Sequence, residues 1–364
     1  MEKKIFTESP EDEQWKMLLN YTYPNNVKRY FEKKQIINPP DDLVEGICGS
    51  ISQAKEYFDA SKVSSLQIAP LLLYYGTTNL FYGIVNLITG QTNRITEHGM
   101  YIKKPSKDKR IADIEIIPKN PKTGALSVFN KIFSTSCDIN NGGAWLLLEL
   151  FASIPDLYDD FIECYEDGIP FVIPVEIIKQ KNVTFERIHP EKIERFKNDL
   201  GIFSQIEHFH ENYLPIQFNP QQMNFIILRY KLESKDIGVY SLSGKKYLLV
   251  SHVKNGKQIT PPLEILMFMA LFSLGYICRY HPEFWNPFIK SDSTGEKLII
   301  EKFLYYERRM LPNLLINALL QERINFTNEP YTPLDLSTSA SEEDIKALVH
   351  EELRKVYFNK KGEP

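Results

Sequence analysis

The stretch Leu71-Leu-Leu-Tyr-Tyr-Gly-Thr-Thr-Asn-Leu-Phe-Tyr-Gly-Ile-Val-Asn-Leu87 lies within the longest helix that the N-terminal third predicts, residues 64–89. It is apolar on nearly every face, and a helix of that kind is buried, so we expect it at the centre of the fold. Gly90 follows as a typical helix stop. Gly76 and Gly83 would let a neighbouring backbone approach closely.

Four polar side chains share one face of this helix, because they follow one another at helical spacing. They are Tyr75, Asn79, Tyr82 and Asn86. An unpaired buried amide costs roughly 1–3 kcal/mol, so these groups must find partners. A buried network that joins neighbouring helices would satisfy them, and so would a polar binding pocket or an oligomer seam.

Working outward, helical periodicity governs both ends of the chain, and the middle alternates as strands do. Further helices are predicted at residues 11–20, 25–34, 41–59, 144–165, 190–203, 263–280 and 294–322, with Pro312 predicting a kink or break in the last. Strands are predicted at 111–117, 168–178, 224–231 and 246–253. We therefore predict a predominantly helical α+β fold. Residues 1–105 and 259–327 form its helical body, and 106–258 form a mixed β-containing insertion.

The C-terminal segment differs from the rest in composition. Residues 328–341 are rich in Pro, Ser and Thr and are typical of a linker. Residues 342–364 predict a final amphipathic helix. Its apolar face predicts contact with a second copy of the chain or with a partner protein through residues 342–357.

Composition excludes several classes of protein. The formal net charge is −4 and 43% of residues are hydrophobic, as in globular proteins without an overall basic field for nucleic acid. The start lacks the apolar stretch of a secretory signal, and residues 263–278 are shorter than a bilayer span, so we expect no membrane segment. Four widely spaced cysteines fit a reduced cytoplasm. No dinucleotide, P-loop or zinc-protease motif occurs, and we expect no cofactor and no metal.

Two short segments carry candidate catalytic residues. Arg94 and His98 follow the central helix in a loop, where a histidine can carry a proton. A His98-Gly99 pair that closes a turn is the alternative. Arg279 and His281 stand where the helix 263–280 ends before Pro282, and Arg279 could grip an anion. The neighbouring candidates for binding are Tyr280, Glu283 and Trp285. Alternatively, the segment is a capping knot in which Trp285 covers the end of the core.

Other charged segments are weaker candidates. Lys103 and Lys104 begin a basic run that could contact phosphate or form a solvated loop. His208 and His210 lie among acids, but three metal ligands are not assured, and a solvated polar stretch explains them. Acidic strand residues with a nearby lysine suit a metal-dependent nuclease only loosely, and exposed strand charges explain them as well: Asp113, Glu115, Glu176 and Lys179.

Three segments together resemble the bacterial YaaC-like family over roughly residues 10–325. They are Tyr74-Tyr-Gly-Thr-Thr-Asn-Leu80, Glu97-His-Gly-Met100 and Arg279-Tyr-His-Pro-Glu-Phe-Trp285. The resemblance implies the fold and a cytoplasmic bacterial setting. More distantly, the chain is similar to HEPN helical domains, many of which are ribonucleases or toxins of defence systems. Catalytic HEPN domains separate Arg from His by four to six residues. Here Arg94 and His98 have three residues between them, and Arg279 and His281 have one.

These observations leave two functional hypotheses. The first is a nucleic-acid- or nucleotide-responsive component of a bacterial stress or defence system. Its site would lie where Arg94, His98, Tyr75 and Asn79 meet the segment 279–283. If it is an enzyme, it is a metal-independent ribonuclease in which a histidine handles the proton and an arginine stabilises phosphate charge. The second is a non-catalytic interaction or oligomerisation module.

Overall fold

The computed structural model describes residues 2–103, 110–119, 123–134, 139, 143–180, 183–196, 200–216 and 225–327. The described residues of Glu11–Ile324, together with Glu2 and Lys3, form the large unit of the chain, and the small unit contains Lys4–Pro10 and Asn325–Thr327. Strands β1 (Glu2–Phe6) and β12 (Arg323–Thr327) pair as a two-stranded sheet. The predicted linker and last helix, residues 328–364, lie outside the described residues.

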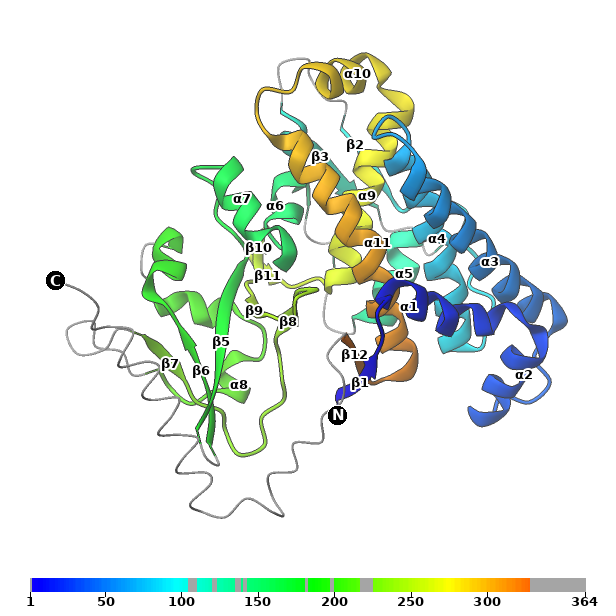
Figure 1. Cartoon of the computed structure of the whole chain (residues 1–364), viewed down its shortest axis with the longest axis horizontal. Coiled ribbons are helices and arrows are strands. Elements are labelled where there is room, and N and C mark those ends of the chain that lie inside the picture. The colour runs from blue at the N-terminus through cyan, green and yellow to red at the C-terminus, as the bar shows by residue number, and fades with distance from the viewer. Residues whose placement is uncertain are drawn as a thin grey trace. The chain divides into compact units, whose positions relative to one another are not determined.

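The centre of the large unit is a group of long helices. Helix α4 (Ala69–Thr89) packs against α3 (Asp41–Val63), α9 (Leu263–Tyr280) and α11 (Glu296–Leu320), as Figure 1 shows. Leu80 and Phe81 of α4 are fully buried, and so is most of α9. The expectation that the stretch 71–87 would be central is confirmed. Helices α1 (Pro10–Leu19) and α2 (Pro24–Lys33) precede this group along the chain.

Glycines of α4 allow α3 to approach, as predicted. A Cβ atom on Gly76 would lie 2.8 Å from Phe58, and one on Gly83 would lie 2.7 Å from Ile51. Gly90 then ends α4 in the left-handed conformation, with φ of 64°, which glycine adopts without steric cost.

Among the helices that the structure describes, α4 and α9 are long and apolar enough to cross a membrane by length and composition alone. Their most apolar windows are 61% and 78% buried inside the protein, as expected of core helices. The thiols of Cys48, Cys164 and Cys278 are free, whereas Cys137 lies outside the described residues.

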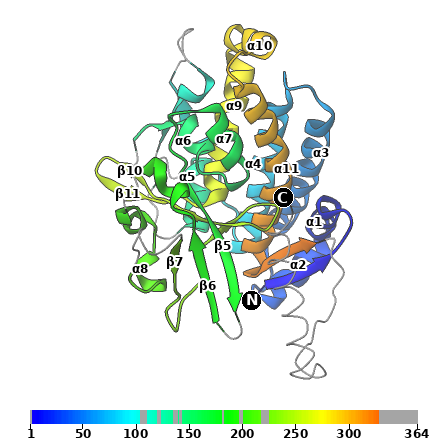
Figure 2. The same ribbon diagram turned by 60° about the vertical axis from the view of Figure 1, so that its left-hand side comes forward.

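The middle of the chain carries the main sheet, with strand order β7-β6-β5-β9-β8 and antiparallel neighbours throughout. Its strands are β5 (Val172–Gln180), β6 (Val183–Ile188), β7 (Ile226–Leu228), β8 (Val239–Tyr240) and β9 (Lys246–Leu249). Figure 2 shows β5, β6 and β7 side by side. Apolar side chains of the sheet, among them Ile173, Ile188 and Leu248, form one cluster with Phe203 and Phe209.

Smaller elements complete the middle region. Strands β2 (Met100–Ile102), β3 (Glu115–Pro118) and β4 (Trp145–Leu146) form a three-stranded sheet, and β10 (His252–Lys254) pairs with β11 (Lys257–Ile259). The short helices are α5 (Ala125–Phe133), α6 (Leu147–Phe151), α7 (Tyr158–Cys164) and α8 (Phe209–Asn212). Short 3₁₀ helices occupy Ile111–Asp113, Pro190–Phe196 and Leu200–Gln205.

The predicted fold class is confirmed, but several elements differ. Residues 144–165 are not one helix, because Pro155 stands between α6 and α7 and a buried strand precedes them. The described residues of the predicted helix 190–203 belong to two 3₁₀ helices, Pro190–Phe196 and Leu200–Gln205, and not to an α-helix. Pro282 comes shortly after the end of α9 and is the first residue of α10 (Pro282–Ser291), a helix that the sequence pattern did not predict. Helix α11 continues through Pro312 without a break. The proposed insertion boundary at 258–259 falls within the large unit, and the one at 105–106 lies outside the described residues. Both boundaries stay predictions.

A buried acid ties the middle region to the start of α11. The Glu296 carboxylate accepts the backbone N–H groups of Ile111 and Ala112, each at 3.2 Å, and the Tyr165 hydroxyl at 3.0 Å. Burial raises the pKa of Glu296, although these donors work in the opposite direction. Glu296 therefore anchors the turn 111–113 to the helical body.

A second buried acid lies in the middle of the helix group without such donors. Glu307 of α11 is fully buried, and neither of its carboxylate oxygens has a hydrogen-bond partner among the described residues. Burial raises the pKa of Glu307 to about 8. The nearby Thr77 hydroxyl on α4 works in the opposite direction, but it does not form a hydrogen bond with the carboxyl group. Glu307 is therefore mostly protonated in the folded protein at neutral pH.

Replacing Gly76 with alanine should lower the free energy of unfolding by about 1–2 kcal/mol, because overpacking against Phe58 outweighs the gain in helix propensity. Gly46→Ala is the matched control. Gly46 lies in α3, where an added Cβ meets no atom within 4 Å. That change should stabilise the protein by about 0.5–1 kcal/mol. Urea unfolding followed by circular dichroism measures both, and equal effects would contradict the close packing of α3 on α4.

Stability should also fall as the pH rises from about 5 to about 8. Folded Glu307 keeps its proton up to about pH 8, whereas the unfolded chain releases it near the ordinary value of 4.5. The free energy of unfolding should fall by at most roughly 1.4 kcal/mol per pH unit. Glu307→Gln should remove this slope and stabilise the protein at pH 8, in urea unfolding at several pH values. Glu301→Gln, at an exposed position of α11, is the control and should follow the wild type.

Candidate functional site

Two of the predicted segments meet, although they are about two hundred residues apart in the chain. The Tyr74 hydroxyl lies 2.6 Å from Nδ1 of His98. The His98 ring packs against the Phe272 ring of α9, with centroids 5.4 Å apart. The Arg279 guanidinium, at the end of α9, donates a hydrogen bond to the Tyr75 hydroxyl on α4.

Close helix packing produces this meeting. Gly275 faces α4, and a Cβ atom added to it would lie 3.2 Å from Cβ of Tyr74. Arg279 follows Gly275 by one helical turn, so it lies on the same side of α9. We call Tyr75, His98, Arg279 and Tyr280 the His98–Arg279 cluster.

The cluster has positive charge and aromatic rings. Arg279 is exposed, and it forms no ion pair with an acid among the described residues. Its guanidinium lies 4.9 Å from the centre of the Tyr280 ring. Burial lowers the pKa of His98, the charge of Arg279 lowers it further, and Glu97 works in the opposite direction. His98 is therefore neutral at physiological pH.

The other residues predicted at this end of α9 pack against one another and against neighbouring rings. The His281 Nδ1 atom lies 3.1 Å from a Glu283 carboxylate oxygen, and its ring packs against Tyr276. Trp285 is fully buried beside Phe288. The capping interpretation therefore describes His281, Glu283 and Trp285 better than a shared site with His98.

Arg94 does not join the cluster through any observed contact. It is exposed and makes no hydrogen bond or ion pair with a residue that the structure describes.

The two asparagines on the polar face of α4 form hydrogen bonds with residues close to them in the chain. The Asn79 amide donates to the Tyr75 carbonyl at 3.0 Å, and Oδ1 of Asn86 accepts both the backbone and side-chain N–H of Asn93 at 3.0 Å. Tyr82 is half-buried on the same helix.

The weaker charged candidates form surface pairs. Lys103 pairs with Glu115 at 3.1 Å, while Lys104 lies outside the described residues. His208 pairs with Glu211 at 2.9 Å. Within the described part of the chain, no group of three or more His, Cys, Asp or Glu side chains could hold a metal ion.

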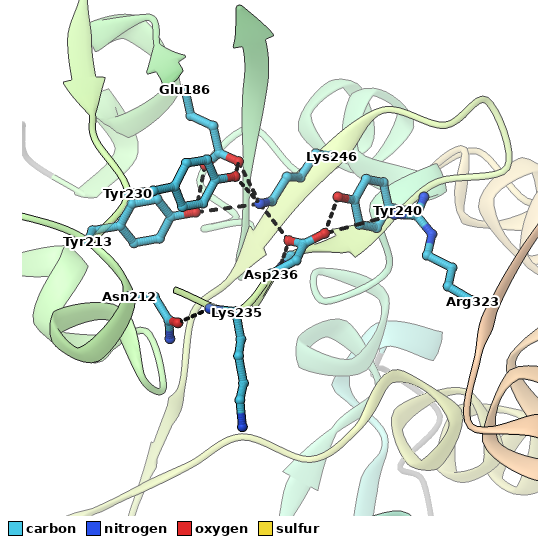
Figure 3. A network of polar contacts seen from close by, with 10 residues as sticks. Glu186, Asn212, Tyr213, Tyr230, Lys235, Asp236, Tyr240, Lys246 and Arg323 are labelled. Carbon is cyan, nitrogen blue, oxygen red and sulfur yellow. Dashed lines mark hydrogen bonds and ion pairs between the residues drawn. The ribbon is translucent and has the colours of Figure 1, made fainter. Parts of the chain in front are cut away.

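A buried ionic network that the sequence pattern does not predict lies on the main sheet (Figure 3). The Lys246 ammonium lies 2.6 Å from a carboxylate oxygen of Glu186 and 2.6 Å from one of Asp236, and the side chains of Lys246 and Glu186 are 0% exposed. The Tyr213 hydroxyl donates to Glu186 at 2.6 Å, and Tyr230 donates to the same carboxylate.

The network reaches the start of β12 through its exposed side. The Tyr240 hydroxyl donates to Asp236, and the Arg323 guanidinium lies over the Tyr240 ring, 3.2 Å from its centre. Arg323 also lies 3.9 Å from Asp236, so two cations face two carboxylates. Gly238 leaves room for the Lys246 side chain, which a Cβ atom at residue 238 would overlap. A single glycine is not a specific signal in the sequence, so it could not have predicted this network.

This network stabilises the fold and is not a reactive centre. Burial alone would lower the pKa of Lys246, but Glu186 and Asp236 outweigh burial and raise it. The three ammonium protons are used by Glu186, Asp236 and Tyr230, the last at 3.1 Å. Lys246 therefore has no free electron pair to act as a nucleophile or base.

A serine–histidine pair in the middle region is also unreactive. The Ser153 hydroxyl lies 2.9 Å from Nε2 of His252, but it donates to the Glu149 carbonyl at 2.7 Å and is fully buried. Burial, and then the charge of Lys254, lower the pKa of His252 to about 3. The pair is closed to any substrate.

A family model described as YaaC-like Protein matches residues 11–319. The chain belongs to the YaaC-like family. The matched span confirms the resemblance predicted over roughly residues 10–325, and it contains every described member of the His98–Arg279 cluster. No curated protein matches this YaaC-like chain, and no solved structure does.

Lys246→Met should lower the free energy of unfolding by roughly 3–5 kcal/mol, because it leaves Glu186 buried without its cation. Adding Glu186→Gln removes that charge, so the double variant should be more stable than Lys246→Met alone. Urea unfolding measures all three proteins. Lys245→Met, at an exposed neighbouring position, is the control and should change stability by less than about 0.5 kcal/mol. A similarly small effect of Lys246→Met would contradict the ionic network.

Proposed function

We propose that this YaaC-like protein binds the phosphate group of a nucleotide or of single-stranded RNA at the His98–Arg279 cluster. The observation that carries the proposal is the exposed Arg279 guanidinium, which has no ion-pair partner among the described residues and lies beside a neutral histidine. A guanidinium that is held in place without a carboxylate partner keeps its charge and its planar N–H donors available to a ligand anion.

The geometry of Arg279 supports phosphate as that anion. A guanidinium has five N–H donors in a planar fork, and the Tyr75 hydroxyl accepts from one nitrogen only. The remaining donors match two oxygens of a phosphate group. The hydrogen bond to Tyr75 also limits the orientations that Arg279 can adopt, which lowers the entropic cost of binding.

The rings around Arg279 support a nucleotide over a bare phosphate ion. Tyr280 is 52% exposed, and its ring lies 4.9 Å from that of Tyr276. Tyr75 is half-buried against Tyr57, with ring centroids 5.8 Å apart. Bases of single-stranded nucleic acid stack on such rings without regard to sequence.

We further propose that the protein is a cytoplasmic, nucleotide-responsive component of a bacterial stress or defence system, which is the setting that the HEPN-like interpretation of its sequence predicts. Hydrolysis of RNA is the alternative outcome of the same site. The interaction module remains a prediction, since residues 342–357 lie outside the described residues. No observation on the described chain favours it over ligand binding.

Arg279→Gln should weaken binding of ATP and of a fluorescein-labelled single-stranded RNA decamer by roughly 10- to 100-fold, because a charge-assisted hydrogen bond is lost. Arg29→Gln makes the same change of charge at an exposed position on α2 and should bind as the wild type does. Fluorescence anisotropy measures RNA binding and calorimetry measures ATP binding.

The same incubations show whether the RNA stays intact, and we expect that it does. Failure of both ligands to bind wild-type protein would refute the proposal, as would equal affinity of the Arg279 and Arg29 variants. Cleavage of RNA that disappears in His98→Ala would instead establish the ribonuclease.

A further inference from the structure

We infer that Tyr74 is a positioning residue that holds His98 as the tautomer protonated on Nε2, so that His98 offers a ligand a hydrogen-bond donor and no base. The inference rests on the proposed function for the identity of the ligand. The tautomer itself follows from the hydrogen bonding of Tyr74.

The Tyr74 hydroxyl has a single proton and little access to water. Tyr74 is 3% exposed, and its hydroxyl lies 2.6 Å from Nδ1 of His98. The Thr78 hydroxyl also lies near it, but Thr78 donates its proton to the Tyr74 carbonyl at 2.9 Å and makes no hydrogen bond with the Tyr74 hydroxyl. If Nδ1 carried a proton, it would donate to the Tyr74 hydroxyl, and the hydroxyl proton would then have no acceptor within hydrogen-bond distance among the described residues. Tyr74 therefore donates to Nδ1, and the proton of the neutral imidazole lies on Nε2.

The core fixes the position of this hydroxyl. The Tyr74 ring packs against Phe268 and Phe272 of α9, with centroids 5.8 and 5.6 Å away. The His98 ring packs against Phe272 and Tyr74 in turn. The tautomer of an exposed loop residue is thus set by the packing of α4 on α9.

The surroundings of His98 keep it neutral, so the tautomer decides its chemistry. Burial and the charge of Arg279 both lower the pKa of His98. With Nδ1 accepting from Tyr74 and Nε2 protonated, the ring has no lone pair left for a ligand proton. It can donate from Nε2 to an oxygen that only accepts, as phosphate oxygens do.

This arrangement narrows the ligand class and the reaction. A phosphate monoester or diester can accept from Nε2 of His98 and from Arg279 together. General-base attack on RNA needs a histidine nitrogen that takes the proton of the ribose 2′-hydroxyl, and this tautomer lacks one. The cluster is therefore suited to hold a nucleotide or RNA rather than to cleave it.

Nitrogen NMR of protein labelled with ¹⁵N-histidine tests the tautomer without any ligand. The His98 signals are assigned by their loss in His98→Gln. In the wild type, the ¹⁵N chemical shift of Nδ1 should be that of an unprotonated ring nitrogen, and the shift of Nε2 should be that of a protonated one. Tyr74→Phe should move both chemical shifts toward the average values of a ring that exchanges between the two tautomers. Tyr82→Phe, on the same helix, should leave them unchanged. A protonated Nδ1 in the wild type, or no change in Tyr74→Phe, would overturn the inference.

Binding of ATP tests the donor role. The glutamine amide can place an N–H group close to that of Nε2, so His98→Gln should bind ATP within about threefold of the wild type. His98→Ala should lose roughly tenfold. Equal losses in the two variants would refute the donor role, even if Tyr74→Phe proves unstable. If ATP and RNA fail to bind at all while the wild-type nitrogen shifts are as expected, the proposed function fails and the tautomer stands.

Discussion

The apolar contact between α4 and α9 is the constraint on which the rest of this structure depends. Both helices are apolar nearly all round, so each must bury its surface against other helices to leave water. Glycines let the backbones approach, and Gly275 places α9 against Tyr74. This packing joins the N-terminal and C-terminal parts of the chain into one core. It also brings the end of α9 near the loop that follows α4, so that the charge of Arg279 lowers the pKa of His98.

Three buried acids of this protein differ in the partners that surround their carboxyl groups. Glu186 is paired with Lys246 and two tyrosines, and Glu296 accepts two backbone N–H groups and a tyrosine. Both hold distant segments together. Glu307 has neither arrangement among the described residues, and its raised pKa leaves it largely neutral. Burial of a charge requires compensation, and where the fold does not supply it the group takes up a proton.

The same reasoning separates the proposed ligand site from the other polar clusters. In the network of Lys246 and in the pair of Ser153 with His252, every strong donor is used by a neighbour or closed off by burial. At the His98–Arg279 cluster, charge and N–H donors are exposed and lack an acid to satisfy them. Polar groups whose bonding is completed inside the protein stabilise it, whereas exposed donors held in place by the core can serve a ligand.

Local pattern was sufficient for much of the fold. The apolar periods of residues 71–87 and 263–280, and the stops at Gly90 and Pro282, determined the core helices, because helix formation there depends on neighbouring residues and a uniformly apolar surface. Pattern also singled out His98 and Arg279. It failed for residues 144–165, where short buried elements around Pro155 have no clear period, and for β1 and β12, which pair across nearly the whole chain.

Only the tertiary structure decided which polar residues work together. Arg94 and His281 were as plausible in sequence as His98 and Arg279, yet one is exposed without an observed partner and the other caps a packing knot. Lys246 is one of many lysines in the sequence, and its burial between two acids depends on the pairing of β5, β6 and β9. Such contacts join residues far apart in the chain, so their geometry is set by how the helices and strands pack and cannot be read from neighbouring residues alone.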